Sequence, residues 1–175
     1  MTTTRPVGQN ASMSVAIVMG SSSDATIMDD AVQILRSFGI TVEVRVLSAH
    51  RTPDDAIEFA RSAAGRGVKV VIAAAGGAAH LAGVLAAATP LPVIGVPVAL
   101  ANLGGLDSLL SMVQMPKGVP VAVVAVNGAR NAGLLAVRIM ALSDERLAAE
   151  QDRYRKELAD GVRDQDAEIV ARYSA

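Results

Sequence analysis

Five apolar stretches along the chain alternate with segments in which apolar residues recur every three or four positions. Each stretch has the length of a strand and is followed by Gly, Ser, Pro or Asn and then by a helical pattern. The stretches occupy residues 14–19, 40–47, 68–75, 93–97 and 121–126. Repeated alternation of strand and helix predicts a three-layer α/β domain, in which helices cover both faces of a parallel five-stranded sheet.

The polarity of the strands indicates their positions in this sheet. Residues 40–46 alternate apolar and polar side chains, which is typical of an edge strand. Residues 68–75 and 121–126 are almost continuously apolar, so they are expected to be central or well covered. A second strand at the edge fits the flavodoxin-like strand order 2-1-3-4-5.

The helical segments have different characters. Met28, Ala31, Val32 and Leu35 form one apolar stripe, and Gly39 ends this first helix. Further helices are expected over residues 53–64, 78–88, 105–113 and 129–142. Charged residues dominate from 144 to 172, which predicts a long polar C-terminal helix that lies over the domain or reaches a neighbouring subunit.

These elements predict one domain with two tails. The expected parts are a flexible N-terminal tail over residues 1–13, a single α/β domain over 14–160 and a C-terminal tail over 161–175. The C-terminal tail is expected to fray or to pack on a neighbouring subunit.

Composition narrows the classes of partner. The 175 residues carry a formal net charge of −1 with mixed signs, so no broad basic field attracts nucleic acid or an anionic membrane. The lack of cysteine excludes disulfides and thiolate sites, which fits a reducing cytoplasm, and two histidines are too few for an imidazole-based zinc site. Abundant small apolar residues with only 2% aromatics favour close helix contacts in a homo-oligomer.

One long interval resembles a membrane span in its composition. Residues 70–106 contain no Asp, Glu, Lys or Arg. Gly76–Gly77, Pro90, Pro92 and Pro97 nevertheless divide the interval into pieces of strand or short-helix length. The sequence therefore predicts buried strands and an alanine-rich helix, and no membrane association.

Candidate chemistry gathers where the strands end, which is the ligand-binding edge of an open parallel sheet. Both histidines of the chain lie in these loops together with an arginine and an aspartate. The loop segments are residues 20–24 (GSSSD), 48–53 (SAHRTP), 76–80 (GGAAH), 97–105 and 127–130 (NGAR). A histidine exchanges protons near neutral pH, and an arginine fork suits a phosphate or a carboxylate. Proton transfer on an anionic substrate is the functional interpretation.

Each loop also has a purely structural interpretation. Ser23 or Asp24 can cap the first helix, although free amides and hydroxyls there also suit a phosphate. Thr52 and Pro53 form a helix start, and Gly76–Gly77 suits either a tight turn or a close approach to a ligand. His80 is expected about one turn into the third helix, where a packed histidine is as plausible as a catalytic one.

The common nucleotide cofactors lack their sequence signatures. No glycine-rich dinucleotide fingerprint follows the first strand, and no lysine has the glycine spacing of a P-loop. No aromatic residue lies in a strand-end loop to stack on a flavin, and no phosphate-accepting aspartate follows the third strand. These absences disfavour NAD, ATP, a flavin and a phosphate-accepting receiver domain.

Together the loops resemble a known family. GSSSD at 20–24, SAHRTP at 48–53, GGAAHL at 76–81, GVP at 95–97 and VQMP at 113–116 closely resemble the catalytic subunit of the phosphoribosylaminoimidazole carboxylase family, in the family's order. The resemblance covers roughly residues 14 to 160. It implies an isomerase of de novo purine synthesis that moves a carboxylate from the exocyclic nitrogen to C4 of an aminoimidazole ribonucleotide, with no metal, biotin, ATP or other cofactor.

The resemblance also assigns site residues. His50 matches the acid/base, while Ser21, Asp24 and Arg51 match substrate-binding positions. By their chemistry, Arg51 and Ser23 suit the 5′-phosphate and Asp24 the ribose hydroxyls, whereas Ser21 and the amides around Gly76–Gly77 suit the migrating carboxylate or transient CO2. Ser48 and Ala78 complete the expected substrate-binding set, and His80 is expected in a supporting role.

Two activities occur in this family. One group moves the carboxylate and the other uses free CO2 directly, and Arg51 followed by Thr52–Pro53 resembles the first group. Many members have a lysine at the position of Ser22, so that side chain is not expected to be required. The resemblance further implies a homo-octamer and a separate ATP-dependent enzyme that supplies the substrate. A direct CO2-dependent carboxylase and a non-catalytic flavodoxin-like nucleotide-binding module remain the alternatives.

Overall fold

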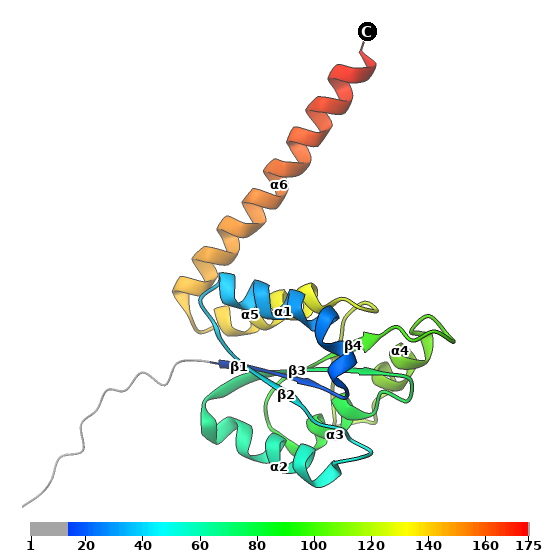
Figure 1. The fold of residues 1–175 in the computed structure, drawn as a ribbon. Helices are drawn as coiled ribbons and strands as arrows, with labels where there is room; N and C mark the ends of the chain where they lie inside the picture. Colours follow the sequence, from blue (N-terminus) through cyan, green and yellow to red (C-terminus); the bar gives the residue numbers. More distant parts are fainter. Residues whose placement is uncertain (1–13, 175) are drawn as a thin grey trace, which may run out of the picture.

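A five-stranded parallel sheet forms the centre of the computed structural model, which describes residues 14–174 (Figure 1). The strands are β1 (Ser14–Met19), β2 (Thr41–Val46), β3 (Val68–Gly76), β4 (Val93–Val98) and β5 (Ala122–Val123). Their order is β2-β1-β3-β4-β5, and all four pairs are parallel. The fold class and strand order predicted from the sequence are confirmed.

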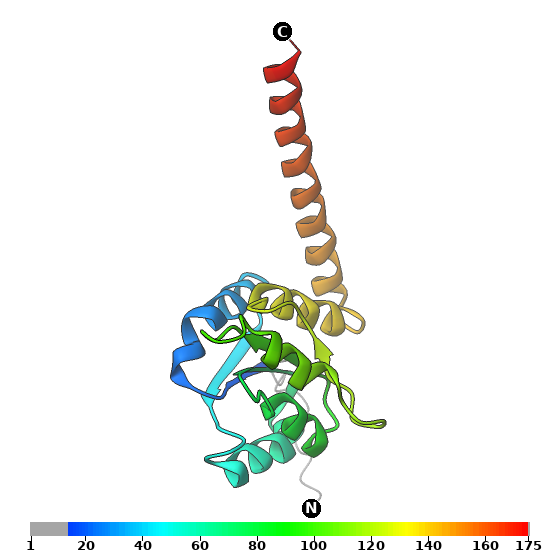
Figure 2. The ribbon, with the colours of Figure 1, turned by 90° about the vertical axis from the view of Figure 1, so that its right-hand side faces the viewer.

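Helices cover both faces of the sheet. They are α1 (Ala25–Ser37), α2 (Pro53–Ala63), α3 (Leu81–Ala88), α4 (Leu106–Val113), α5 (Ala129–Ala141) and α6 (Glu145–Tyr173). α1 and α5 pack on one face and α2 and α3 on the other, as the two views show (Figure 1, Figure 2). Alternate residues of the buried strands therefore enter two separate cores: Ile72 belongs to the first and Val71 to the second.

The sequence predicted the position of one edge strand correctly and that of the other wrongly. β2 lies at one edge, as its alternating polarity predicts, and Val44 and Val46 on it are exposed. The expectation that residues 121–126 are central or well covered is wrong, because β5 is the other edge and only two residues long. Pro97 of β4 has no N–H group to extend the ladder, so the pairing stops early.

The interval without charges folds within the domain. It contributes most of β3 together with α3 and β4, and the six residues of β4 are all buried. Within residues 14–174, no helix combines the length and the apolar character that crossing a membrane requires.

α6 is anchored only at its beginning. Leu147 is fully buried, the Tyr154 ring meets the Phe38 ring edge-on at 5.8 Å, and Arg146 Nη1 donates to Phe38 O. Leu158, further along the helix, is half-exposed. From there the helix projects away from the body of the domain (Figure 1, Figure 2).

The structure describes only one of the two predicted tails, the C-terminal one. Residues 161–173 continue α6 without interruption. The predicted N-terminal tail over residues 1–13 lies outside the described residues. The division of the chain at residue 160 stays a prediction.

Candidate active site

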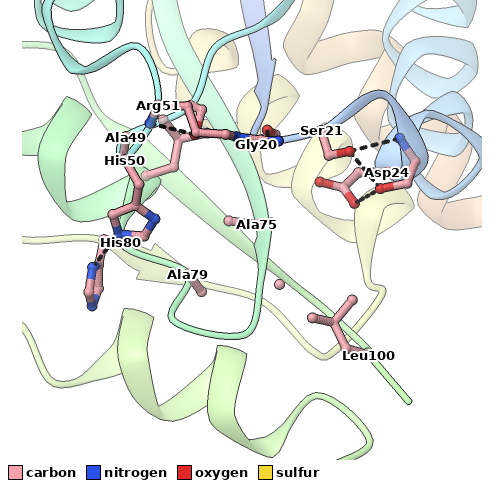
Figure 3. A pocket seen from close by; sticks show the side chains of 14 residues that line it. Gly20, Ser21, Asp24, Ala49, His50, Arg51, Ala75, Ala79, His80 and Leu100 are labelled. Carbon is pink, nitrogen blue, oxygen red and sulfur yellow. Dashed lines mark hydrogen bonds between the residues drawn. The ribbon is translucent and has the colours of Figure 1, made fainter. Parts of the chain in front are cut away.

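Loops after β1, β2, β3 and β4 surround a pocket of about 390 Å³ at the carboxyl edge of the sheet (Figure 3). Most of the predicted site residues line it, from loops far apart in the sequence. They are Ser21, Ser23, Asp24, Ser48, His50, Arg51, Gly76 and His80. Gly77 and Ala78 were predicted as well, but they are not among the lining residues. The structure adds Leu100 and several small apolar residues that the sequence analysis did not identify.

The first loop turns through a short 3-10 helix at Ser22–Asp24 before α1 begins. Ser21 caps this turn, since its Oγ accepts from Ser23 N at 3.3 Å. The Ser23 hydroxyl lies 2.9 Å from Ser21 Oγ and 3.2 Å from Asp24 Oδ1. The expected side-chain cap of α1 is absent, because Asp24 occupies the N-cap position without capping the helix. Its carboxylate lines the pocket instead.

Asp24 is a carboxylate with little access to solvent. Only 5% of the residue is exposed. Burial raises its pKa above 3.8, because a charged carboxylate loses solvation there, although the hydrogen bonds from Ser23 and Ser21 oppose that rise. A ligand that donates hydrogen bonds to the carboxylate would therefore replace the solvation that folding removes.

The second loop is fixed by Thr52 and Ser48. Thr52 Oγ1 accepts from Ser48 N at 3.0 Å and lies 3.3 Å from Ser48 O, while Thr52 N donates to Ser48 O at 2.9 Å. Thr52 is the N-cap residue of α2 and Pro53 its first residue, as predicted. The expected capping bond is absent, because the Thr52 hydroxyl is bonded to the preceding turn. That turn presents His50 and Arg51.

Arg51 connects two of the loops. Its Nη2 donates to Gly20 O at 2.8 Å, and its Nε donates to Ser48 Oγ at 3.3 Å. The guanidinium is thereby held between the ends of β1 and β2 (Figure 3). A guanidinium has more N–H groups than these two bonds use, so donors are left for an anion in the pocket.

The two histidines face each other. His50 Nε2 lies 2.7 Å from His80 Nδ1, and the rings meet edge-on with centroids 4.8 Å apart (Figure 3). Because a neutral imidazole donates at one nitrogen and accepts at the other, this contact fixes the tautomer of one ring relative to the other. The histidines come from separate loops, yet they form one unit on the pocket wall.

His80 stands at a different point of α3 from the one predicted. The helix starts at Leu81, so His80 is its N-cap residue and does not lie one turn inside it. Gly77 and Ala79 have positive φ values of 68° and 41°, which prevent the helix from starting at residue 78. This start places His80 at the pocket.

The Gly76–Gly77 turn is held by α4. Gly77 N donates to Ser108 Oγ at 2.9 Å, and that hydroxyl donates to Val98 O at 2.7 Å. Ser108 is fully buried. The Gly77 amide is therefore occupied within the protein, which explains why this predicted ligand amide does not face the pocket. No motif in the sequence marked Ser108, because its role depends on a contact 31 residues away.

Within residues 14–174, no group of three or more His, Asp or Glu side chains is arranged to hold a metal ion. The side chains that gather in the pocket are instead suited to an anionic, hydroxyl-bearing ligand: a guanidinium, two serine hydroxyls of the first loop, a buried carboxylate and an imidazole pair.

Residues 14–161 match the family model described as AIR carboxylase, where AIR is aminoimidazole ribonucleotide. The chain belongs to the AIR carboxylase family. A family member from Mycobacterium leprae, named N5-carboxyaminoimidazole ribonucleotide mutase, is 59% identical over 155 residues, which cover 89% of this chain and 91% of that protein. The protein of the same name from Saccharolobus solfataricus is 53% identical over 148 residues, covering 85% of this chain and 94% of the other.

The fold of the family is shared as well. A crystal structure of Treponema denticola PurE superposes with a TM-score of 0.81 at 29% sequence identity, covering 89% of this chain and 97% of that one. The resemblance noted in the strand-end loops is therefore confirmed over nearly the whole domain.

Proposed function

We propose that this protein is an isomerase of purine biosynthesis that converts N5-carboxyaminoimidazole ribonucleotide into 4-carboxy-5-aminoimidazole ribonucleotide. The observation that carries the proposal is the convergence of His50, Arg51 and Asp24 on one pocket in a chain 59% identical to a protein named for this reaction. The substrate has a phosphate, a ribose and a carboxylate to be bound, and the pocket offers a group for each.

Different residues of the pocket suit the phosphate, the ribose and the carboxylate of the substrate. Arg51 and the Ser23 hydroxyl bind the 5′-phosphate, because both donate hydrogen bonds and Arg51 adds charge. The Asp24 carboxylate accepts hydrogen bonds from the ribose hydroxyls, which restores solvation that burial removes. Ser21, Ser48 and the Gly76 backbone border the remaining space, where the migrating carboxylate is held.

His50 carries the proton through both halves of the reaction. As the bond between the exocyclic nitrogen and the carboxylate carbon breaks, the nitrogen keeps the electron pair and takes a proton from His50, and CO2 is released. C4 of the ring then attacks CO2, and neutral His50 removes the C4 proton once the carbon–carbon bond has formed. The histidine returns to its starting state, so one group acts as acid and then as base.

His80 supports this cycle as a positioning residue. Its 2.7 Å contact with His50 holds the orientation and the tautomer of that ring. No metal or cofactor takes part in these steps.

The proposal also concerns the oligomeric state of the protein, its cellular location and the source of its substrate. We infer a cytoplasmic homo-octamer that receives its substrate from a separate ATP-dependent carboxylating enzyme. In support, α6 extends away from its own domain and carries exposed Leu158, Val162, Ile169 and Tyr173, which a neighbouring subunit could cover.

The experiment supplies purified protein with either candidate substrate. Conversion of the N5-carboxylated ribonucleotide without added bicarbonate supports the mutase. Activity only on uncarboxylated aminoimidazole ribonucleotide with bicarbonate would assign the direct carboxylase instead. Binding of either ribonucleotide without any turnover would assign a non-catalytic nucleotide-binding module.

A further inference from the structure

Asn127 lies in the loop after β5, in one of the strand-end segments that the sequence analysis singled out, yet the proposed reaction does not use it. Its φ of 57° lies in the left-handed region, which asparagine adopts more readily than most other residues. Gly128 N closes the turn by donating to Ala125 O at 2.8 Å. The chain therefore leaves the sheet at this turn.

The Asn127 side chain continues the hydrogen bonding that β5 leaves unfinished. β5 pairs with β4 through only two of its residues. Further along β4, Asn127 N donates to Pro97 O at 2.8 Å, and Ala99 N donates to Asn127 Oδ1 at 2.9 Å. Residues 97 and 99 face the same side of an extended chain, so the amide oxygen takes the place of a strand carbonyl. This bond holds the backbone directly before Leu100.

Leu100 is the pocket residue that this bond positions. It lines the pocket and packs on Gly76, where a Cβ atom would lie only 2.9 Å from Leu100 Cγ. Leu100 is 47% exposed, so a ligand can still cover it. It stands on the side of Asp24, at the end of the pocket opposite His50 (Figure 3). Leu100 therefore lies beside the part of a ligand that Asp24 binds.

We propose that Asn127 is a positioning residue for substrate binding, which holds Ala99 and thereby places Leu100 against the pocket. The inference rests on the reaction proposed above, in which Asp24 binds the ribose. A ribose at Asp24 covers the exposed part of Leu100, and a side chain that is already in place loses less freedom on binding. Because His50 lies at the other end of the pocket, removal of the Asn127 amide weakens binding without slowing proton transfer.

Two substitutions separate the side chain of Asn127 from its backbone. Asn127→Gly keeps the left-handed conformation and the N–H that donates to Pro97 O, but it removes the acceptor for Ala99 N. Asn127→Asp keeps an acceptor of the same reach. Asn127→Gly should raise KM for the N5-carboxylated ribonucleotide roughly two- to tenfold, the effect of one hydrogen bond, with kcat within about twofold of wild type. Asn127→Asp should restore KM.

Binding is measured separately by calorimetry with aminoimidazole ribonucleotide, which has no carboxylate to move. Asn127→Gly and Leu100→Ala should each raise its Kd, and the double variant should match Leu100→Ala, because the side chain that Asn127 positions is then already absent. Asn102→Gly is the matched control. It makes the same substitution in the loop that carries Leu100, at an exposed residue outside the pocket lining, and should match wild type.

Each outcome decides one point. A folded Asn127→Gly protein with the KM and Kd of wild type overturns the role of Asn127, and so do effects on Kd that add in the double variant. If Asn127→Gly does not fold in thermal unfolding, Asn127→Ala, which also lacks the acceptor, takes its place with the same expected and overturning results. Wild-type protein that binds aminoimidazole ribonucleotide without converting the N5-carboxylated form contradicts the proposed function, while the Kd values still decide the role of Asn127.

Discussion

Folding changes the protonation of Asp24. It is nearly buried, and the loss of solvation raises its pKa despite the hydrogen bonds from Ser23 and Ser21. The folded protein therefore binds this proton more tightly than the unfolded chain. The contribution of Asp24 to the free energy of unfolding is fully present below pH 3.8 and is lost as the pH rises through the raised native pKa.

The substitution Asp24→Asn should remove this pH dependence. Relative to wild type, the variant should gain stability as the pH rises from below 3.8 to neutral, and its affinity for the ribonucleotide should fall because the amide accepts fewer hydrogen bonds. Denaturant unfolding across this pH range and calorimetric titration measure the two effects. A stability difference that does not change with pH would show that burial does not control this group.

At the level of single residues, the sequence identified the polar side chains of the pocket better than their contacts. His50, Arg51 and Asp24 were predictable because their chemistry and their place after a strand are both visible in the sequence. The bond from Thr52 back to Ser48 was not, because a threonine before a proline has the same pattern whichever way its hydroxyl turns.

Among the elements, α4 has an unexpected part in shaping the pocket. Its buried Ser108 joins Gly77 N to Val98 O, so it connects the turn after β3 to the end of β4. Ser108→Ala would remove this partner from the part-buried Gly77 N–H and from the buried Val98 carbonyl, and leaving a buried polar group unsatisfied costs roughly 1–3 kcal/mol.

We expect Ser108→Ala to lower both the unfolding free energy and kcat, with less effect on substrate affinity. Ser111→Ala is the matched control on the same helix, because Ser111 Oγ bonds mainly to Asp107 O and lies 3.5 Å from Gly77 O. Thermal unfolding and steady-state kinetics compare the two. Equal effects of both substitutions would contradict a specific role for Ser108.

The element boundaries that the sequence missed depend on backbone geometry. The third helix was expected from residue 78 because alanines favour helices, but the positive φ of Ala79 delays its start to Leu81. The apolar run at 121–126 indicated a covered strand, yet its partner β4 contains Pro97 and pairs with only two of its residues. Neither effect is visible from hydrophobic pattern alone.

At the scale of the whole molecule, α6 projects away from the domain beyond its anchored beginning (Figure 1). Leu158, Val162, Ile169 and Tyr173 follow one another at spacings of four, seven and four residues, so they share one face of α6, and all are exposed. If a neighbouring subunit covers this stripe, a charge placed on it should weaken the assembly.

Ile169→Glu should therefore shift the protein to a smaller species in light scattering after size-exclusion chromatography. Ala171→Glu is the control, because it adds the same charge to the opposite, exposed face of the helix and should leave the mass unchanged. Identical masses for wild type and both variants would contradict an assembly through this stripe.

The central claim is that His50 transfers the proton in a pocket that binds the ribonucleotide without it. His50→Asn keeps the size of the side chain similar and removes its ability to exchange a proton. We predict that turnover of the N5-carboxylated ribonucleotide falls by roughly 10²–10⁴-fold, while the dissociation constant measured by calorimetry stays within a few-fold of wild type. Turnover within tenfold of wild type in this variant would contradict the account.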